Sequence, residues 1–345
     1  MDPFQPSRGI RQGDPLSPYL FILCMEILGA YILDKCDDNL WDPISASRGG
    51  VTFSQLFFAD DLVLFTKTDV KNCRAIRDVL DTFCDLSGQK VSAKKSRVFF
   101  SPNLAQHHKE ELYNILNFRS TPSLGKYLGF PIKHKSIPQD FGVVVERIQN
   151  RLARGKTHLL SFAGGFVLTQ TTLSTILNYS MQCAALPSKI TQSLDRLCRN
   201  FIWGITDSKR KLHLVSWKKI TKPKKEGGFG LQSAKERNSA LLAKLNWRFH
   251  QERDSLWARV LSHKYLTRRR QLRPKPGSCS PTWAALKKGE PIFMKGIKWI
   301  AGKESELLFW HDKWLSDGLI KSLIAGPLQR NEDSILLRNV TRHNF

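Results

Sequence analysis

The stretch that most constrains this chain runs from Phe57 to Phe65, where apolar residues flank the adjacent pair Asp60-Asp61. The pattern predicts two short β-strands joined by a tight turn, with both carboxylates at the tip. Because the flanking residues are nearly all apolar, we expect both faces of the hairpin to be buried. Two acids held on a buried hairpin repel each other and lose hydration unless a positive group lies against them.

A divalent cation is the natural partner of such a carboxylate pair. Mg²⁺ prefers carboxylate oxygens together with phosphate oxygens and water, and Mn²⁺ is the alternative ion. Asp60 and Asp61 are therefore candidate metal ligands. The competing interpretation is an ordinary solvent-exposed turn, because aspartate is common in turns.

The charge of the chain points to a polyanionic partner. Lys and Arg number 54 against 30 Asp and Glu, which gives a net charge of +24, and such an excess is typical of proteins that bind nucleic acid. The bases are densest from about Lys209 to Lys275. No run of about 18 apolar residues occurs, so a membrane partner is disfavoured. A solvated basic surface without a defined ligand is the alternative.

The cysteines bear on the cellular compartment. The seven cysteines are scattered, odd in number and never in a C-x-x-C pair. This pattern suits reduced thiols inside a cell and disfavours a compact zinc site. We expect an intracellular protein that is not secreted.

Residues 8–18 predict a loop that leads into a helix, with Asp14 as the cap and Pro15 at the first helical position. In this helix Leu20, Leu23, Ile27 and Tyr31 recur at helical spacing, with Cys24 and Leu28 beside them, which predicts an apolar inner face. In the loop, Arg11, Gln12 and Gly13 are suited to contact a phosphate or a base, and Gly13 would allow close approach of another backbone. A plain capped helix is the alternative.

The region after the hairpin predicts a second helix that starts after Asp69 and ends at Gly88. A basic segment and a short apolar strand, residues 98–100, follow. Together these elements predict an α+β unit with the acidic turn on an antiparallel sheet. Farther along, helical patterns cover residues 141–152, 166–177, 190–203 and 239–250, the first three of which indicate a small helical bundle.

Several of these blocks, in this order and spacing, resemble the reverse transcriptase of plant non-LTR (LINE-type) retrotransposons. The similar blocks are residues 8–18, 58–61, 86–88 with 95–96, and 127–129, and weaker similarities follow at 160–164, 201–203, 223–228 and 309–314. The resemblance implies a partial reverse-transcriptase palm over 1–135, made of an antiparallel sheet plus helices. It also implies a helical thumb-like bundle over 136–205 and a basic, tryptophan-containing and mostly helical C-terminal region over 206–345.

The same resemblance implies an RNA-directed DNA polymerase that carries out two-metal nucleotidyl transfer. Its partners would be an RNA template and a DNA primer, or their hybrid, together with deoxynucleoside triphosphates; it would reside in the nucleus or cytoplasm. The implied roles are metal binding and catalysis for Asp60 and Asp61, with Asp60 in direct contact with Mg²⁺. Lys95 would lie near the leaving pyrophosphate. The residues of the nucleotide and template pocket would be Arg11, Gln12 and Gly13, and those that grip the primer 3′ end would be Tyr127, Leu128 and Gly129.

The sequence also departs from the pattern of that family, which places another catalytic aspartate on a strand upstream of the residue 8–18 block. Here the only acid before Arg8 is Asp2, in a different context. Without that carboxylate and the fingers, we expect the chain alone to be inactive as a polymerase. The alternative function is a non-catalytic RNA- or DNA-binding remnant of a retroelement.

Overall fold

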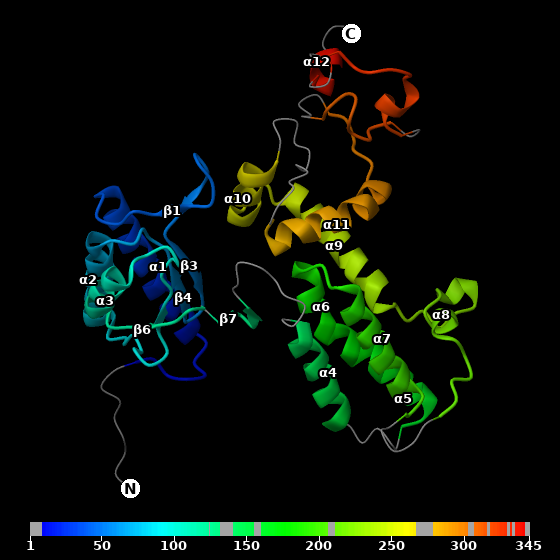
Figure 1. Ribbon diagram of the computed structural model, residues 1–345, viewed down its shortest axis with the longest axis horizontal. Helices are drawn as coiled ribbons and strands as arrows, with labels where there is room; N and C mark the ends of the chain where they lie inside the picture. The colour runs from blue at the N-terminus through cyan, green and yellow to red at the C-terminus, as the bar shows by residue number, and fades with distance from the viewer. Residues whose placement is uncertain are drawn as a thin grey trace. The chain divides into compact units, whose positions relative to one another are not determined.

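The computed structural model is a mostly helical α+β protein with small sheets (Figure 1). It divides into two compact units, Met1–Lys133 and His134–Phe345. The residues that the structure describes are 9–123, 125–131, 141–154, 160–205, 211–266, 279–302, 307–315, 318–329, 332 and 335–341. The further partition at residue 205 stays a prediction.

Three helices organise the first unit. They are α1 (Ser17–Asp37), α2 (Val70–Ser87) and α3 (Gln106–Leu116). The predicted limits of α2 are confirmed: the Asp69 side chain accepts a hydrogen bond from the Asn72 N–H at 2.8 Å, and Gly88 closes the helix with φ +71°. The helices share one core, whose centre includes the fully buried Ile32, Trp41 and Val79.

The strands of the first unit are short and pair two by two. They are β1 (Ile44–Ser45) with β2 (Thr52–Phe53), β3 (Gln55–Phe58) with β4 (Asp61–Leu64), β5 (Arg97–Val98) with β6 (Arg119–Ser120), and β7 (Lys126–Tyr127) with β8 (Phe130–Pro131). The β5–β6 pair is parallel and the others are antiparallel. The expected antiparallel sheet is thus a set of two-stranded ribbons in the described residues. Of the strand predicted over 98–100, only the first residue belongs to β5.

The predicted inner face of α1 is confirmed only in part, because Leu28 is buried and Cys24 and Tyr31 pack against the core, whereas the other three residues do not. Leu20, Leu23 and Ile27 are 49%, 60% and 58% exposed, whereas Leu28 and Ile32 are buried. The reason is that α1 is apolar nearly all the way round, so spacing alone could not choose the face. The helix also begins at Ser17 with Pro18 in its first turn, and the Asp14 carboxylate binds the Leu16 N–H at 2.8 Å in the preceding turn.

The second unit is a succession of helices. In chain order they are α4 (Gly142–Arg154), α5 (Phe162–Leu168), the π-helical η3 (Thr169–Leu173), α6 (Ser174–Cys183), α7 (Ser188–Ile202), α8 (Trp217–Ile220), the 3₁₀ turn η4 (Lys224–Glu226), α9 (Ala234–Gln251), α10 (Leu256–Tyr265), α11 (Pro281–Gly296), the 3₁₀ turn η5 (Ile320–Leu323) and α12 (Leu337–Thr341). The helices predicted over 141–152, 190–203 and 239–250 are confirmed to within a few residues. The one predicted over 166–177 is divided among α5, η3 and α6.

The closest packing in the second unit joins α9 and α11, which lie side by side (Figure 1). A Cβ added to Gly289 would lie 2.4 Å from the backbone carbonyl of Leu242, so only glycine permits this approach. The buried Asn246 side chain donates to the carbonyls of Leu242 at 3.0 Å and Leu286 at 2.8 Å, and thereby joins the two helices.

Candidate active-site hairpin

The Asp60-Asp61 pair lies at the end of the predicted hairpin, with Asp60 in the two-residue turn and Asp61 as the first residue of β4. Phe58 pairs with Asp61, and Ala59 and Asp60 form the turn. Ala59 has φ +50°, a left-handed conformation that is costly for a residue with a side chain. Strained positions of this kind gather at functional sites, where the surroundings hold them in place.

The two faces of this hairpin differ, so the expectation that both are buried is wrong. Leu56 and Phe58 are 37% and 58% exposed, while Phe57 packs against the core. A Cβ added to Gly29 of α1 would lie 3.1 Å from the Phe57 ring. Close contact with a helical glycine therefore fixes β3 from one side only.

Both aspartates at the tip are exposed. Within the described residues, neither carboxylate forms an ion pair with a basic side chain. The described residues also contain no cluster of three or more His, Cys, Asp or Glu side chains that could hold a metal ion. The tip thus offers two carboxylates that no protein cation in this part of the chain neutralises.

A second hairpin brings Tyr127 near the aspartates. β7 and β8 are joined by Leu128 and Gly129, whose φ values of +50° and +78° are those of a type I′ turn. Burial raises the pKa of the Tyr127 phenol, and the negative charge of Asp61 raises it further. Residues 66 positions apart in the sequence therefore lie within electrostatic range of one another.

The remaining predicted site residues are exposed and make no ion pair with the aspartates. Arg11, Gln12 and Gly13 lie in the open loop before α1. Gly13 has φ +88°, a conformation that favours glycine. A Cβ added to it would meet nothing within 4 Å, so the expected close approach of another backbone is not seen in the described residues. Lys95 lies in the turn before β5, where its N–H donates to the Ser92 carbonyl at 3.0 Å.

Sequence reasoning missed the buried Asn72, which holds the exit of β4 in place. Its Oδ1 accepts from the Asp42 N–H and from the Thr66 hydroxyl, both at 2.6 Å. Its Nδ2 donates to the carboxylates of Asp42 at 3.0 Å and Asp69 at 2.6 Å. The one sequence feature that could have indicated this role is the position of Asn72 in the first turn of α2, three residues after the cap Asp69.

The described helices include none that is both long enough and apolar enough to cross a membrane. The strained turn bearing two unpaired carboxylates, the contact of Phe57 with Gly29 of α1 and the nearby Tyr127 hairpin make up the candidate site of the first unit.

Comparison with known proteins assigns the first unit more specifically. Residues 2–132 match the family described as reverse transcriptase (RNA-dependent DNA polymerase). The N-terminal region is thus similar to reverse transcriptase domains, and the similar proteins include plant proteins and Pol polyproteins of retrotransposable elements.

Three relatives illustrate the similarity. A putative ribonuclease H protein of Arabidopsis thaliana is 39% identical over 216 residues, which are 61% of this chain and 35% of the relative. An uncharacterized mitochondrial protein of the same plant is 28% identical over 141 residues, 40% of this chain and 92% of the relative. A retrovirus-related Pol polyprotein from a type-2 retrotransposable element of Drosophila melanogaster is 37% identical over 92 residues, 27% of this chain and 8% of the relative. The matched part of the chain thus spans about a third of the first relative's length.

Proposed function

We propose that the first unit carries the palm hairpin of an RNA-directed DNA polymerase of a LINE-type retrotransposon. Its substrates would be an RNA template, a DNA primer and deoxynucleoside triphosphates. The observation that carries the proposal is the pair Asp60-Asp61, exposed and unpaired at a strained turn within a region that matches the reverse transcriptase family. The electrostatic effect of Asp61 on Tyr127 supports a site that includes the second hairpin.

The residues present fit Mg²⁺. In sites that bind nucleotides this ion is often held by one or two carboxylates, with substrate phosphates and water completing its shell. Asp60 and Asp61 supply two such carboxylates on adjacent residues. When bound, the metal would activate the primer 3′-hydroxyl and neutralise charge on the transferred phosphates.

The other predicted residues have roles that their chemistry supports. The Tyr127 hairpin would orient the primer end, because its phenol lies within electrostatic range of Asp61. The exposed amine of Lys95 would meet the negative charge of the leaving pyrophosphate. The loop with Arg11, Gln12 and Gly13 offers a cation, an amide and open backbone to the nucleotide or template.

We infer that the described residues form an incomplete polymerase site. No third acidic ligand lies with Asp60 and Asp61 in the described parts of the chain. Loss of one bridging carboxylate from a two-metal site costs several kcal/mol of transition-state stabilisation, or on the order of a thousandfold in rate. A site limited to these two carboxylates should therefore bind its substrates better than it turns them over.

The test measures binding of a fluorescent RNA–DNA primer–template by anisotropy while Mg²⁺ is titrated with the complementary deoxynucleoside triphosphate. We expect Mg²⁺ and the nucleotide together to tighten binding, and Asp60→Asn and Asp61→Asn to reduce this tightening by about tenfold or more. Asp85→Asn, which changes an exposed carboxylate on α2, should behave as wild type.

Two outcomes would contradict parts of the proposal. Tightening that is unchanged by both substitutions would remove the metal role of the hairpin. Salt-sensitive binding without any effect of Mg²⁺ or nucleotide would favour the non-catalytic nucleic-acid-binding alternative. Separately, robust primer extension that vanishes in Asp60→Ala would establish the polymerase and overturn the inference of an incomplete site.

A further inference from the structure

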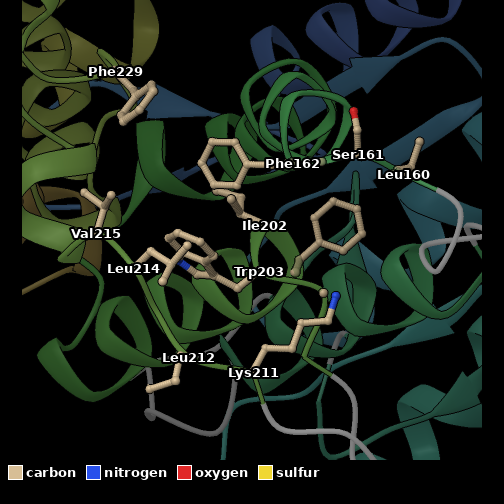
Figure 2. Close-up of a pocket in the computed structure, with 13 residues that line it drawn as sticks. Leu160, Ser161, Phe162, Ile202, Trp203, Lys211, Leu212, Leu214, Val215 and Phe229 are labelled. Carbon is tan, nitrogen blue, oxygen red and sulfur yellow. The ribbon is translucent and has the colours of Figure 1, made fainter.

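The second unit contains an aromatic-lined cavity of about 650 Å³ that the proposed polymerase chemistry does not use. It is lined by the start of α5, the end of α7, the segment 211–215 and Phe229. Figure 2 shows Phe162, Ile202 and Trp203 around its centre, with Phe229 across from them and Lys211 along one edge. Its volume is in the range of pockets that hold small organic ligands. We refer to this cavity as the aromatic pocket.

The rings of the aromatic pocket are close together but are not stacked face to face. The centroids of Phe162 and Trp203 are 5.1 Å apart at 50°, and those of Phe162 and Phe229 are 6.1 Å apart at 66°. Phe162 and Phe229 are nevertheless 37% and 39% exposed. Part of each side chain is thus open to solvent, where a flat aromatic ligand could pack against the ring.

The flank of the aromatic pocket is strongly basic. Residues 211–229 contain six lysines and a single acid, Glu226. Lys211 reaches the end of α7: its amine lies 3.0 Å from the place where a Cβ on Gly204 would stand. Lys218 and Lys219 on α8 are exposed, as is Lys211, and none of these three has an acidic partner within the described residues. The charge here is complementary to a phosphate backbone.

We propose that the aromatic pocket binds an unpaired base of single-stranded RNA or DNA, with the adjoining phosphates against the lysines. Exposed aromatic faces beside unpaired cations are the combination that such strands need, because every base has a face that stacks and every nucleotide carries a negative charge. The inference is independent of the polymerase proposal, since every residue it uses lies in the second unit.

The test compares two labelled strands of equal length, one with bases and one built from abasic nucleotides, in RNA and DNA forms. The full chain should bind the intact strand about tenfold or more tightly than the abasic strand. Phe162→Ala and Phe229→Ala should each weaken binding of the intact strand by about 5- to 100-fold and leave the abasic strand nearly unaffected. Lys211→Ala should weaken both strands and reduce the salt dependence of binding.

Matched controls separate this site from general basic attraction. Trp247→Ala and Lys244→Ala change exposed residues of α9 outside the aromatic pocket and should bind as wild type. Phe162→Leu and Phe229→Leu retain apolar volume, so they should keep the fold by circular dichroism yet still lose base-dependent binding.

Equal affinity of the wild-type chain for intact and abasic strands would overturn the proposal. The proposal would also be overturned if the leucine variants fold and keep full base-dependent binding. Apolar volume without an aromatic ring would then suffice, as expected of a pocket for an apolar peptide. Either result would leave the Mg²⁺ response of the Asp60 variants untouched, so failure of this inference is distinguishable from failure of the proposed function.

Discussion

Replacing Asn72 with alanine tests how the fold supports the acidic hairpin. The side chain is fully buried and makes four hydrogen bonds that join Asp42, Thr66 and Asp69. Thr66 follows β4, and its hydroxyl also lies 3.0 Å from the Asp42 carbonyl, to which its single proton can turn when Asn72 is replaced. Asn72→Ala therefore disconnects the strand exit from the start of α2, although Thr66 keeps one bond.

The expected cost follows from these bonds. A protein hydrogen bond contributes about 0.5–1.5 kcal/mol net, and a buried donor left without a partner costs about 1–3 kcal/mol. The Asp42 N–H loses its acceptor, whereas the carboxylates can turn to water or lysine. We expect Asn72→Ala to lower the free energy of local unfolding of the segment that joins β4 to α2 by about 2–4 kcal/mol.

The destabilisation caused by Asn72→Ala should depend on pH. The hydrogen bond from Asn72, and after it that from Lys71, lowers the pKa of the Asp42 carboxyl. A lowered pKa contributes stability above the ordinary value near 3.9, and this stability is lost as the pH falls through the folded-state pKa. The difference between wild type and Asn72→Ala should thus be largest near pH 7 and shrink in acid.

Hydrogen exchange followed by mass spectrometry on the full chain measures this opening for peptides that cover residues 52–80. Asn114→Ala, at an exposed position on α3, is the matched control and should exchange as wild type. Unchanged protection of these peptides in Asn72→Ala, at pH 7, would refute the view that this side chain holds the hairpin exit.

Three further predictions follow from other contacts. Gly289→Ala should destabilise the second unit by about 1–3 kcal/mol in chemical denaturation, because the new Cβ would collide with the Leu242 backbone; wild-type stability would contradict that packing. Asp61→Asn should lower the pKa of Tyr127, which NMR of labelled tyrosines can follow, since one cause of its elevation is removed; an unchanged titration would place the two residues farther apart. Ala59→Gly should stabilise the chain by up to about 1 kcal/mol, because it relieves the positive φ, and a marked loss of stability in a melting experiment would indicate that the turn is not strained.

Local signals in the sequence predicted the elements that position the hairpin. The Asp60-Asp61 turn and the limits of α2 at Asp69 and Gly88 follow from side-chain chemistry within a few residues, so they were accessible without the fold. The inner face of α1 was not, because apolar residues surround that helix and only tertiary contacts choose among them. Exposure of Phe58 was missed for the same reason.

Features assembled from distant segments could not be predicted in this way. The pair of Asp61 and Tyr127 and the network of Asn72 each join parts of the chain that lie dozens of residues apart. The aromatic pocket likewise brings Phe162, Trp203 and Phe229 together. Phe162 and Trp203 lie in blocks that resemble the family and Phe229 directly follows another, but nothing in their spacing indicates a shared cavity.

The central claim is that the two adjacent carboxylates hold a divalent metal at the hairpin tip. Replacing Mg²⁺ with Fe²⁺ and adding peroxide and ascorbate cleaves a polypeptide backbone near a bound ion, and mass spectrometry locates the cuts. With primer–template and nucleotide present, we predict cleavage within residues 57–65 and near Tyr127, lost in Asp60→Asn and Asp61→Asn and retained in Asp85→Asn. Cleavage elsewhere, or at these sites with equal strength in all variants, would contradict the account.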